Sequence, residues 1–151
     1  MLMSHLRSVR TIDPVTGDVS VECGCLLKDL NRDLVAQGRQ LRLMPSTWRS
    51  ATVGGFIAGG SGGIGSVRWG FLRDPGHLLG LEVVTLESEP RVLQLDASEA
   101  EALNHAYGTN GIITALTLAT APSIDWQELV VDCSDWSSAV EFARRCCAAA
   151  I

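Results

Sequence analysis

A dense run of glycines is the feature of this sequence best suited to chemistry. Nine of the 15 glycines lie between Gly54 and Gly76, together with Ser61 and Ser66. Glycine permits positive φ and lets the backbone approach a ligand without a Cβ in the way. Successive backbone N–H groups in such a stretch can form a concave site for an anion. The run therefore predicts a backbone loop that holds a phosphate-bearing cofactor.

The run contains a literal G-x-G-x-x-G pattern at Gly60, Gly62 and Gly65. That pattern indicates a dinucleotide-binding fold only where it joins a buried strand to a helix. Gly70 and Pro75 follow too soon for a helix of useful length. The sequence also lacks G-x-x-x-x-G-K-[ST], so it excludes the P-loop of nucleoside triphosphate enzymes.

Other reactive side chains give weaker patterns. Cys23-Gly-Cys25 has one intervening residue rather than the roughly two to four usual for zinc, so free buried thiols are expected and no metal site. His77 and His105 are interpreted as surface or capping side chains. The serines lack a paired histidine and aspartate, which excludes a serine hydrolase. The catalytic residues are therefore unknown from the sequence.

Composition and charge narrow the class of protein. Hydrophobic residues make up 46% and charged residues 19%, which are globular values. The net charge of −5 argues against a nucleic-acid surface. No apolar run has the length of a transmembrane segment or the form of a signal peptide, so a soluble, cytoplasmic protein is expected. Asp74 and Glu82 are expected to form ion pairs with Arg68 or Arg73.

The elements that must position the glycine run are hairpins with helices between them. Residues 45–76 show no regular pattern, and Gly38 stands where a helix C-cap glycine belongs. The fold class is α+β, with an antiparallel-rich sheet and flanking helices. We expect strands over residues 8–13, 19–23, 78–86, 91–95, 112–121 and 128–133, and helices over 26–35, 99–105 and 136–150.

Several motifs occur together at family-like spacing: Thr52-Val-Gly-Gly55, Ser61-Gly-Gly63, Arg68-Trp-Gly70, Asp74, Leu79-Gly-Leu-Glu-Val-Val84, Val19-Ser-Val-Glu-Cys-Gly24, Leu43-Met-Pro45 and Gly108-Thr-Asn-Gly111-Ile112-Ile113-Thr114. Over roughly residues 8–122 they resemble the FAD-binding (PCMH-type) domain of the vanillyl-alcohol oxidase/p-cresol methylhydroxylase family. The resemblance is closest to FAD-linked 2-hydroxy-acid dehydrogenases and glycolate-oxidase-like flavoproteins. Phe56 and Trp69 depart from the asparagine and tyrosine common in that family.

The resemblance implies FAD as the cofactor and a type-2-like FAD-binding subdomain as the fold. It assigns Gly54 and Gly55 to the pyrophosphate, the 61–63 and 65–66 backbone to the ribityl chain and flavin ring, and the 111–113 segment to the adenosine end. The expected cofactor-binding residues are Pro45, Thr47, Thr52, Val53, Gly54, Gly55, Ser61, Gly62, Gly63, Gly65, Ser66, Gly108, Gly111, Ile112 and Ile113.

The resemblance further implies an FAD-dependent oxidoreductase that oxidises a hydroxylated small molecule, such as the 2-hydroxy acids D-lactate or glycolate. A sugar-nucleotide reductase with a similar cradle and a non-catalytic remnant or split-gene module are the alternatives. Residues 1–124 are expected to form part of the FAD-binding domain, without the family's N-terminal βαβ subdomain, and residues 125–151 to begin a second α/β domain.

On this reading the chain alone is not expected to turn over substrate. The sheet that contains residues 19–23 and 78–86 is expected to leave apolar surface and strand edges uncovered. We therefore expect a homodimer or association with the missing domains.

Overall fold

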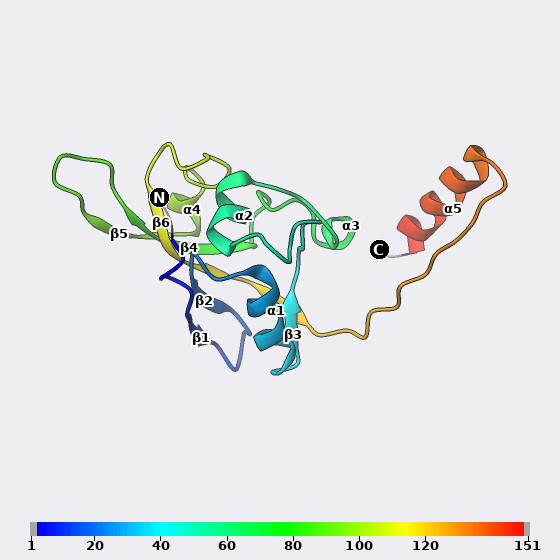
Figure 1. The fold of residues 1–151 in the computed structure, drawn as a ribbon, viewed down its shortest axis with the longest axis horizontal. Coiled ribbons are helices and arrows are strands. Elements are labelled where there is room, and N and C mark those ends of the chain that lie inside the picture. The colour runs from blue at the N-terminus through cyan, green and yellow to red at the C-terminus, as the bar shows by residue number, and fades with distance from the viewer. Residues whose placement is uncertain (1–2, 150–151) are drawn as a thin grey trace.

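The computed structural model describes residues 3–149 of the chain. A five-stranded antiparallel sheet lies at its centre, and a separate pair of short strands lies beside it (Figure 1). The elements in chain order are β1 (Val9–Ile12), β2 (Val19–Glu22), α1 (Leu27–Val35), β3 (Arg39–Leu41), α2 (Val53–Gly59), α3 (Ser66–Trp69), β4 (Leu78–Val84), β5 (Val92–Asp96), α4 (Ala97–Ala100), β6 (Ile112–Leu118), β7 (Thr120–Pro122) and α5 (Trp136–Ala149). The expected α+β fold class is confirmed.

The strand order of the large sheet is β1-β2-β6-β4-β5, with every neighbouring pair antiparallel. β2 and β4 are therefore interior strands, and the edges are β1 and β5. The strand edges that this sheet leaves unpaired within residues 3–149 are those of β1 and β5. The small sheet pairs β3 with β7, also antiparallel.

One face of the large sheet packs against helices. In β2 the side chains of Val19 and Val21 are fully buried, while the alternate residues of the strand are only half-buried, as the two-residue period of a strand requires. From α1, the side chains at the helical spacing Leu27, Leu30 and Leu34 are fully buried. Each such leucine contributes about 1.5–3 kcal/mol on removal from water.

Two helices occur in residues 45–76, where the sequence predicted no regular structure. α2 begins after Thr52, whose Oγ1 accepts from the Gly55 backbone, and ends at Gly60, which adopts a left-handed conformation with φ 61°. α3 is a single turn. The helix α1 ends with Ala36 as its C-cap, and Gly38 follows with φ 71°.

Two predicted strands differ in the structure. Residues 128–133 form no strand, and Leu129 and Val130 are exposed, because no neighbouring strand supplies the ladder of hydrogen bonds. The predicted strand 112–121 breaks at Ala119, so that β6 pairs within the large sheet and β7 pairs with β3. The helix predicted over residues 99–105 is the shorter α4, which begins two residues earlier, after an Asp96 capping box.

The ion-pair prediction for Glu82 and Asp74 is wrong in its partners. The Glu82 carboxylate accepts from both terminal nitrogens of Arg10, at 3.0 and 3.1 Å. The Asp74 carboxylate accepts from the Phe71 backbone N–H at 2.7 Å. Both carboxylates thus hold the structure together, since Glu82 links β4 to the edge strand β1 across the sheet and Asp74 closes a turn.

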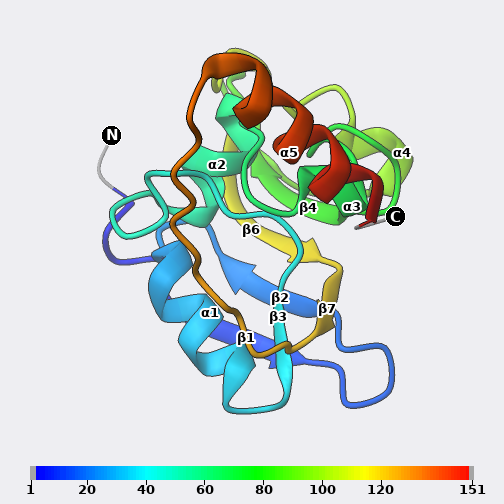
Figure 2. The same cartoon turned by 90° about the vertical axis from the view of Figure 1, so that its right-hand side faces the viewer.

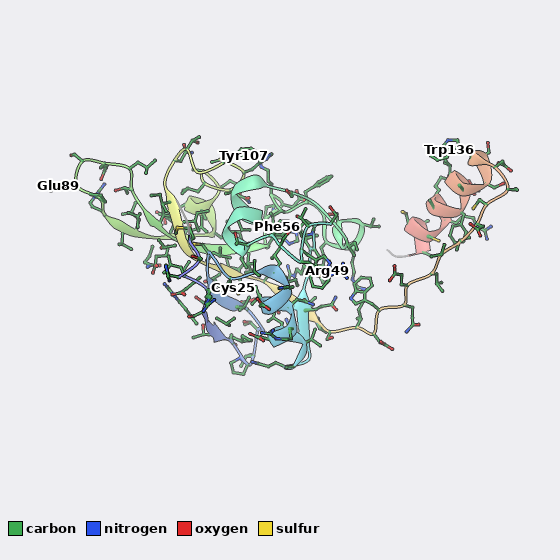
Figure 3. All side chains as sticks on the ribbon, in the orientation of Figure 1. Cys25, Arg49, Phe56, Glu89, Tyr107 and Trp136 are labelled. Carbon is green, nitrogen blue, oxygen red and sulfur yellow. The ribbon has the colours of Figure 1, made fainter. Side chains whose placement is uncertain are left out.

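The helix α5 is confirmed, and it lies apart from the sheet at the end of an extended segment (Figures 1 and 2). Its Trp136 side chain is 82% exposed and projects away from the body of the structure (Figure 3). Across residues 3–149, no helix is both long enough and apolar enough to cross a membrane.

Candidate cofactor-binding site

Helix α2 organises the candidate site because the predicted residues fall at its two ends. The helix has seven residues, which corresponds to a length of about 10 Å. At its beginning lie Thr47, Thr52, Val53, Gly54 and Gly55. Beyond its end lie the 60–66 loop and the turn at Gly108–Gly111.

The backbone donors at the beginning of α2 are already engaged. Val53 N–H donates to the Cys25 carbonyl and Gly54 N–H to the Cys23 carbonyl, both at 2.8 Å. Gly55 N–H donates to Thr52 Oγ1 at 3.1 Å. Gly54 and Gly55 have helical conformations, and neither has a positive φ. These two glycines therefore do not form a turn with free N–H groups.

Gly54 and Gly55 differ in their surroundings. Gly54 is buried, and a Cβ there would lie 2.6 Å from the Cys23 Cβ. Gly55 is exposed, and a Cβ there would meet only the Thr52 hydroxyl, at 3.0 Å. Packing against Cys23 explains why position 54 is a glycine. Gly55 leaves the surface of α2 open to a ligand from outside.

The loop after α2 runs beside the segment that follows β3. Ile64 and Met44 exchange two backbone hydrogen bonds, of 2.9 and 3.0 Å. A Cβ at Gly63 would overlap the Met44 carbonyl, and a Cβ at Gly65, where φ is 102°, would overlap the carbonyl of Arg42. The glycines of this loop thus let two backbone segments approach closely.

Unused donors gather in this loop. The backbone N–H groups of Ser61, Gly62 and Gly65 have no acceptor within residues 3–149. Ser61 and Gly62 are exposed, while Gly63 N–H donates to Ser66 Oγ at 3.2 Å. Exposed donors without protein partners are suited to an anionic group or to the carbonyl oxygens of a ligand. The loop therefore fits the cofactor better than the beginning of α2 does.

The turn before β6 lies against the same end of α2. His105 N–H donates to the Ile57 carbonyl and Tyr107 N–H to the Ala58 carbonyl, both at 3.0 Å. A Cβ at Gly60 would overlap the His105 ring. The structure thus brings the turn at Gly108 beside the 60–66 loop, although the two segments are more than 40 residues apart in the sequence.

His105 and Tyr107 have positive φ, of 62° and 53°. A left-handed conformation at a residue other than glycine costs about 1 kcal/mol or more, and such residues cluster at functional sites. Tyr107 is 73% exposed and lies beside α2 (Figure 3). Tyr107 could not be recognised from the sequence, because tyrosine does not signal a left-handed conformation.

The remaining predicted residues take different positions. Pro45 is buried next to the 60–66 loop, Thr47 is exposed, and Ser66 begins α3. Ile112 is half-buried on β6, and Ile113 is 9% exposed with its side chain in the core. Only the backbone of Ile113 is therefore available to a ligand.

A hollow of about 480 Å³ lies at the beginning of α2, where Thr52, Cys25, Arg7 and Asp29 contribute to its walls. Cys25 is 4% exposed, and burial raises the pKa of its thiol. Burial likewise raises the pKa of Cys23. Both thiols therefore stay protonated at neutral pH and are not activated nucleophiles.

His77, expected to be a surface or capping side chain, is buried and takes a capping position at the end of α3. It is 4% exposed, and its Nε2 lies 2.8 Å from the Trp69 carbonyl oxygen, to which it donates. It therefore ties the loop before β4 to the end of α3. His105, in contrast, is exposed as expected.

Unused backbone donors on the glycine-rich loop of an α+β domain are a feature of domains that bind an anionic cofactor through the backbone. The family described as "FAD binding domain" matches residues 1–93. The chain belongs to this FAD-binding domain family, and the predicted cofactor, FAD, is confirmed. The resemblance to the vanillyl-alcohol oxidase/p-cresol methylhydroxylase type of domain is confirmed with it.

Curated relatives are similar over most of this chain. Mitochondrial D-2-hydroxyglutarate dehydrogenase of Arabidopsis thaliana is 28% identical over 142 residues, covering 88% of this chain and 25% of that protein. D-lactate dehydrogenase of Anaerostipes hadrus is 33% identical over 126 residues, covering 80% and 26%. The glycolate oxidase subunit GlcD of Bacillus subtilis (strain 168) is 31% identical over 84 residues, covering 56% and 17%. The chain spans about a quarter of the length of the dehydrogenases it matches.

The fold is also similar to that of a solved alkyldihydroxyacetonephosphate synthase. The TM-score is 0.71 with 24% sequence identity, and the match covers 80% of this chain and 22% of the synthase. This likeness shows that the chain has the fold of the corresponding segment of that protein.

Proposed function

We propose that this chain supplies part of the FAD site of an oxidoreductase that oxidises a small 2-hydroxy acid. The family match supports the cofactor. The names of three relatives, which act on D-2-hydroxyglutarate, D-lactate and glycolate, support the substrate class. A hydroxyl-bearing carbon next to a carboxylate is common to the three acids.

The free donors of the 60–66 loop are the observation that carries this proposal. In it, the N–H groups of Ser61, Gly62 and Gly65 bind oxygens of the ribityl chain and flavin ring. The turn at Gly108–Gly111 binds the adenosine end, and the exposed side of Gly55 lies along the pyrophosphate. Bound FAD supplies the hydride acceptor, while the protein supplies position and electrostatics.

The other assignments remain predictions. Residues 125–151 are proposed to belong to a second unit, which is consistent with the position of α5 apart from the sheet (Figure 1). A cytoplasmic location and a homodimer stay predictions from the sequence. We propose that the catalytic base belongs to the part of the relatives' length that this chain does not span, so this chain alone gives no dye-linked turnover of D-lactate or glycolate.

The variant Gly62→Val tests whether the 60–66 loop binds FAD. The Cβ position at Gly62 is 3.5 Å from Ser66 Oγ and φ there is not positive, so the fold accommodates a side chain while the branched group blocks the approach of a ligand. Titration of FAD by flavin fluorescence should show an affinity about tenfold weaker than that of the parent chain, as for the loss of one hydrogen bond worth about 1.4 kcal/mol.

Gly59→Ala is the matched control, because a Cβ at Gly59 makes only an ordinary contact of 3.7 Å with Ser61 Oγ. It should bind FAD as the parent does. Circular dichroism should report the same fold for both variants. Equal FAD affinity in Gly62→Val and the parent would refute the assignment of the loop.

A further inference from the structure

A second site lies between the β3–β7 sheet, α3 and the segment that follows β7. It is a pocket of about 150 Å³, lined chiefly by Gln40, Arg42, Arg68, Trp69, Pro122 and Trp126. Its walls combine indole rings and a proline ring with two guanidinium groups. Gly65, one of the three residues with a free N–H in the 60–66 loop, also lines the pocket, whereas Ser61 and Gly62 do not.

Both guanidinium groups stack on one indole. The Cζ atoms of Arg42 and Arg68 lie 4.7 and 5.3 Å from the ring centroid of Trp69. Arg42 is held in place, because its Nε donates to the Thr120 carbonyl at 3.1 Å and its Nη1 to the Gly76 carbonyl at 2.9 Å. Its Nη2 has no acceptor within residues 3–149.

Neither arginine has a counter-ion within residues 3–149. The ion pairs of this part of the chain use the side chains of Arg10, Arg32, Arg91 and Arg144. Burial lowers the pKa of Arg42, and the nearby Arg39 lowers it further, whereas Asp18 raises it. A chain of net charge −5 thus keeps two unpaired cations in one small pocket. An anion that entered would relieve this unfavourable arrangement.

Gln40 gives an independent indication that the pocket takes a ligand. The residue is only 6% exposed, and its Oε1 accepts from Ile124 N–H and Trp126 Nε1, both at 3.2 Å. Its Nε2 has no acceptor within residues 3–149. Within residues 3–149, Asn104 Oδ1 is the only side-chain nitrogen or oxygen atom that is both fully buried and without a hydrogen-bond partner. The Gln40 Nε2 atom, which also has no partner, is therefore not fully buried and is accessible from the pocket. Buried amide donors normally have a partner.

We propose that this pocket binds a small organic carboxylate with a flat apolar body. Planar guanidinium groups match the two oxygens of a carboxylate, and the Gln40 amide adds a third donor. The indole rings of Trp69 and Trp126 and the ring of Pro122 provide apolar walls for a flat carbon skeleton.

Benzoate is the probe, with benzamide as its neutral isostere and acetate as a carboxylate without the flat body. Each of the four tryptophans gives one indole N–H signal in a ¹H–¹⁵N NMR spectrum of the chain. Benzoate should shift the signals of Trp69 and Trp126 in a saturable manner and leave Trp48 and Trp136 unmoved. Benzamide and acetate should bind at least about tenfold more weakly.

Arg68→Gln is the variant that tests the charge, because the Arg68 side chain is exposed and makes no hydrogen bond within residues 3–149, so the fold does not depend on its guanidinium group. It should weaken benzoate binding about tenfold or more. Arg49→Gln is the matched control, since Arg49 stacks on Trp48 at 5.1 Å in the same way but lies outside the pocket. It should leave benzoate affinity unchanged.

Gln40→Glu places a carboxylate beside the two arginines and should abolish benzoate binding while keeping the acceptor for Trp126. Equal binding of benzamide and benzoate, an unchanged affinity in Arg68→Gln, or shifts of all four indole signals alike would each overturn the proposal.

Discussion

The Gly54 backbone donates to the Cys23 carbonyl across 2.8 Å, and no side chain fits between the two residues. The contact fastens the beginning of α2 to the end of β2. Because Cys23 is 3% exposed, it cannot move toward solvent to make room. The junction of this helix with the sheet therefore depends on the absence of a Cβ at one position.

Gly54→Ala should destabilise the fold by about 1–3 kcal/mol, because the added methyl overpacks the contact with Cys23. Urea unfolding followed by circular dichroism measures the effect. Gly54→Val should destabilise the fold more, so it is unsuitable as a test of cofactor binding with the fold intact.

Gly59→Ala is again the comparison, since it lies in the same helix with room for a Cβ. It should stabilise the fold by about 0.5–1 kcal/mol through helix propensity. Similar unfolding midpoints for the two alanine variants would contradict the packing argument.

Glu82 should make stability depend on acid pH. Hydrogen bonds from Arg10, then Gln94 and Thr114, lower its pKa to about 2, from an ordinary value of 4.5. A lowered carboxyl pKa stabilises the folded state fully above the unfolded-state value, and the contribution is lost as pH falls from about 4.5 to about 2. Glu82→Gln should lower the free energy of unfolding at pH 7 by about 1–2 kcal/mol, after allowance for solvent screening.

The deficit of Glu82→Gln relative to the parent chain should shrink below pH 4.5 and disappear near pH 2 in urea titrations. Glu87→Gln is the control, because Glu87 pairs with Arg91 on an exposed turn. It should change stability little at any pH. A deficit of Glu82→Gln that is independent of pH would contradict the ionic origin.

Tyr107→Gly should raise the free energy of unfolding by about 0.5–1 kcal/mol, because glycine relieves the positive φ of 53°. Tyr107→Phe keeps that conformation and loses only the 3.3 Å contact between the hydroxyl and His105 Nε2. It should give no gain. Thermal unfolding of both variants measures the difference, and equal midpoints would show that the turn stores no strain.

The five cysteines should divide into two groups by reactivity. Cys133, Cys146 and Cys147 are exposed, whereas Cys23 and Cys25 are buried. In the native chain at mild alkaline pH, three thiols should react quickly with an aromatic disulfide reagent and the other two only after unfolding. Rapid reaction of all five in the native state would contradict the burial of the Cys23–Cys25 segment.

Local patterns predicted the hairpins of this fold and the course of α1, because alternation and helical spacing directly reflect a buried face. They missed α2, whose seven residues include three glycines, since packing of Val53, Phe56 and Ile57 outweighs low helix propensity. Thr52 and Gly60, as cap residues, were the signals available in the sequence.

For the same reason, the sequence predicted the 60–66 loop of the cofactor site but not the second pocket. The glycine run predicted the loop that carries the free donors, because the local backbone conformation requires glycine at these positions. The pocket of Arg42, Arg68 and Trp126 joins residues far apart in the sequence, and only the pairing of β3 with β7 brings them together. A strand at 128–133 was expected from β-propensity alone, without a partner to complete it.

The central strand of the large sheet is β6, the last of its five strands in the chain. During synthesis the β1–β2 hairpin and the β4–β5 hairpin therefore leave the ribosome with nothing between them. Residues 112–118 must be inserted between two waiting edges before the sheet exists. Its formation depends on contacts of long sequence separation, which are slow to form, and the two open hairpins are the species exposed to mispairing in the meantime.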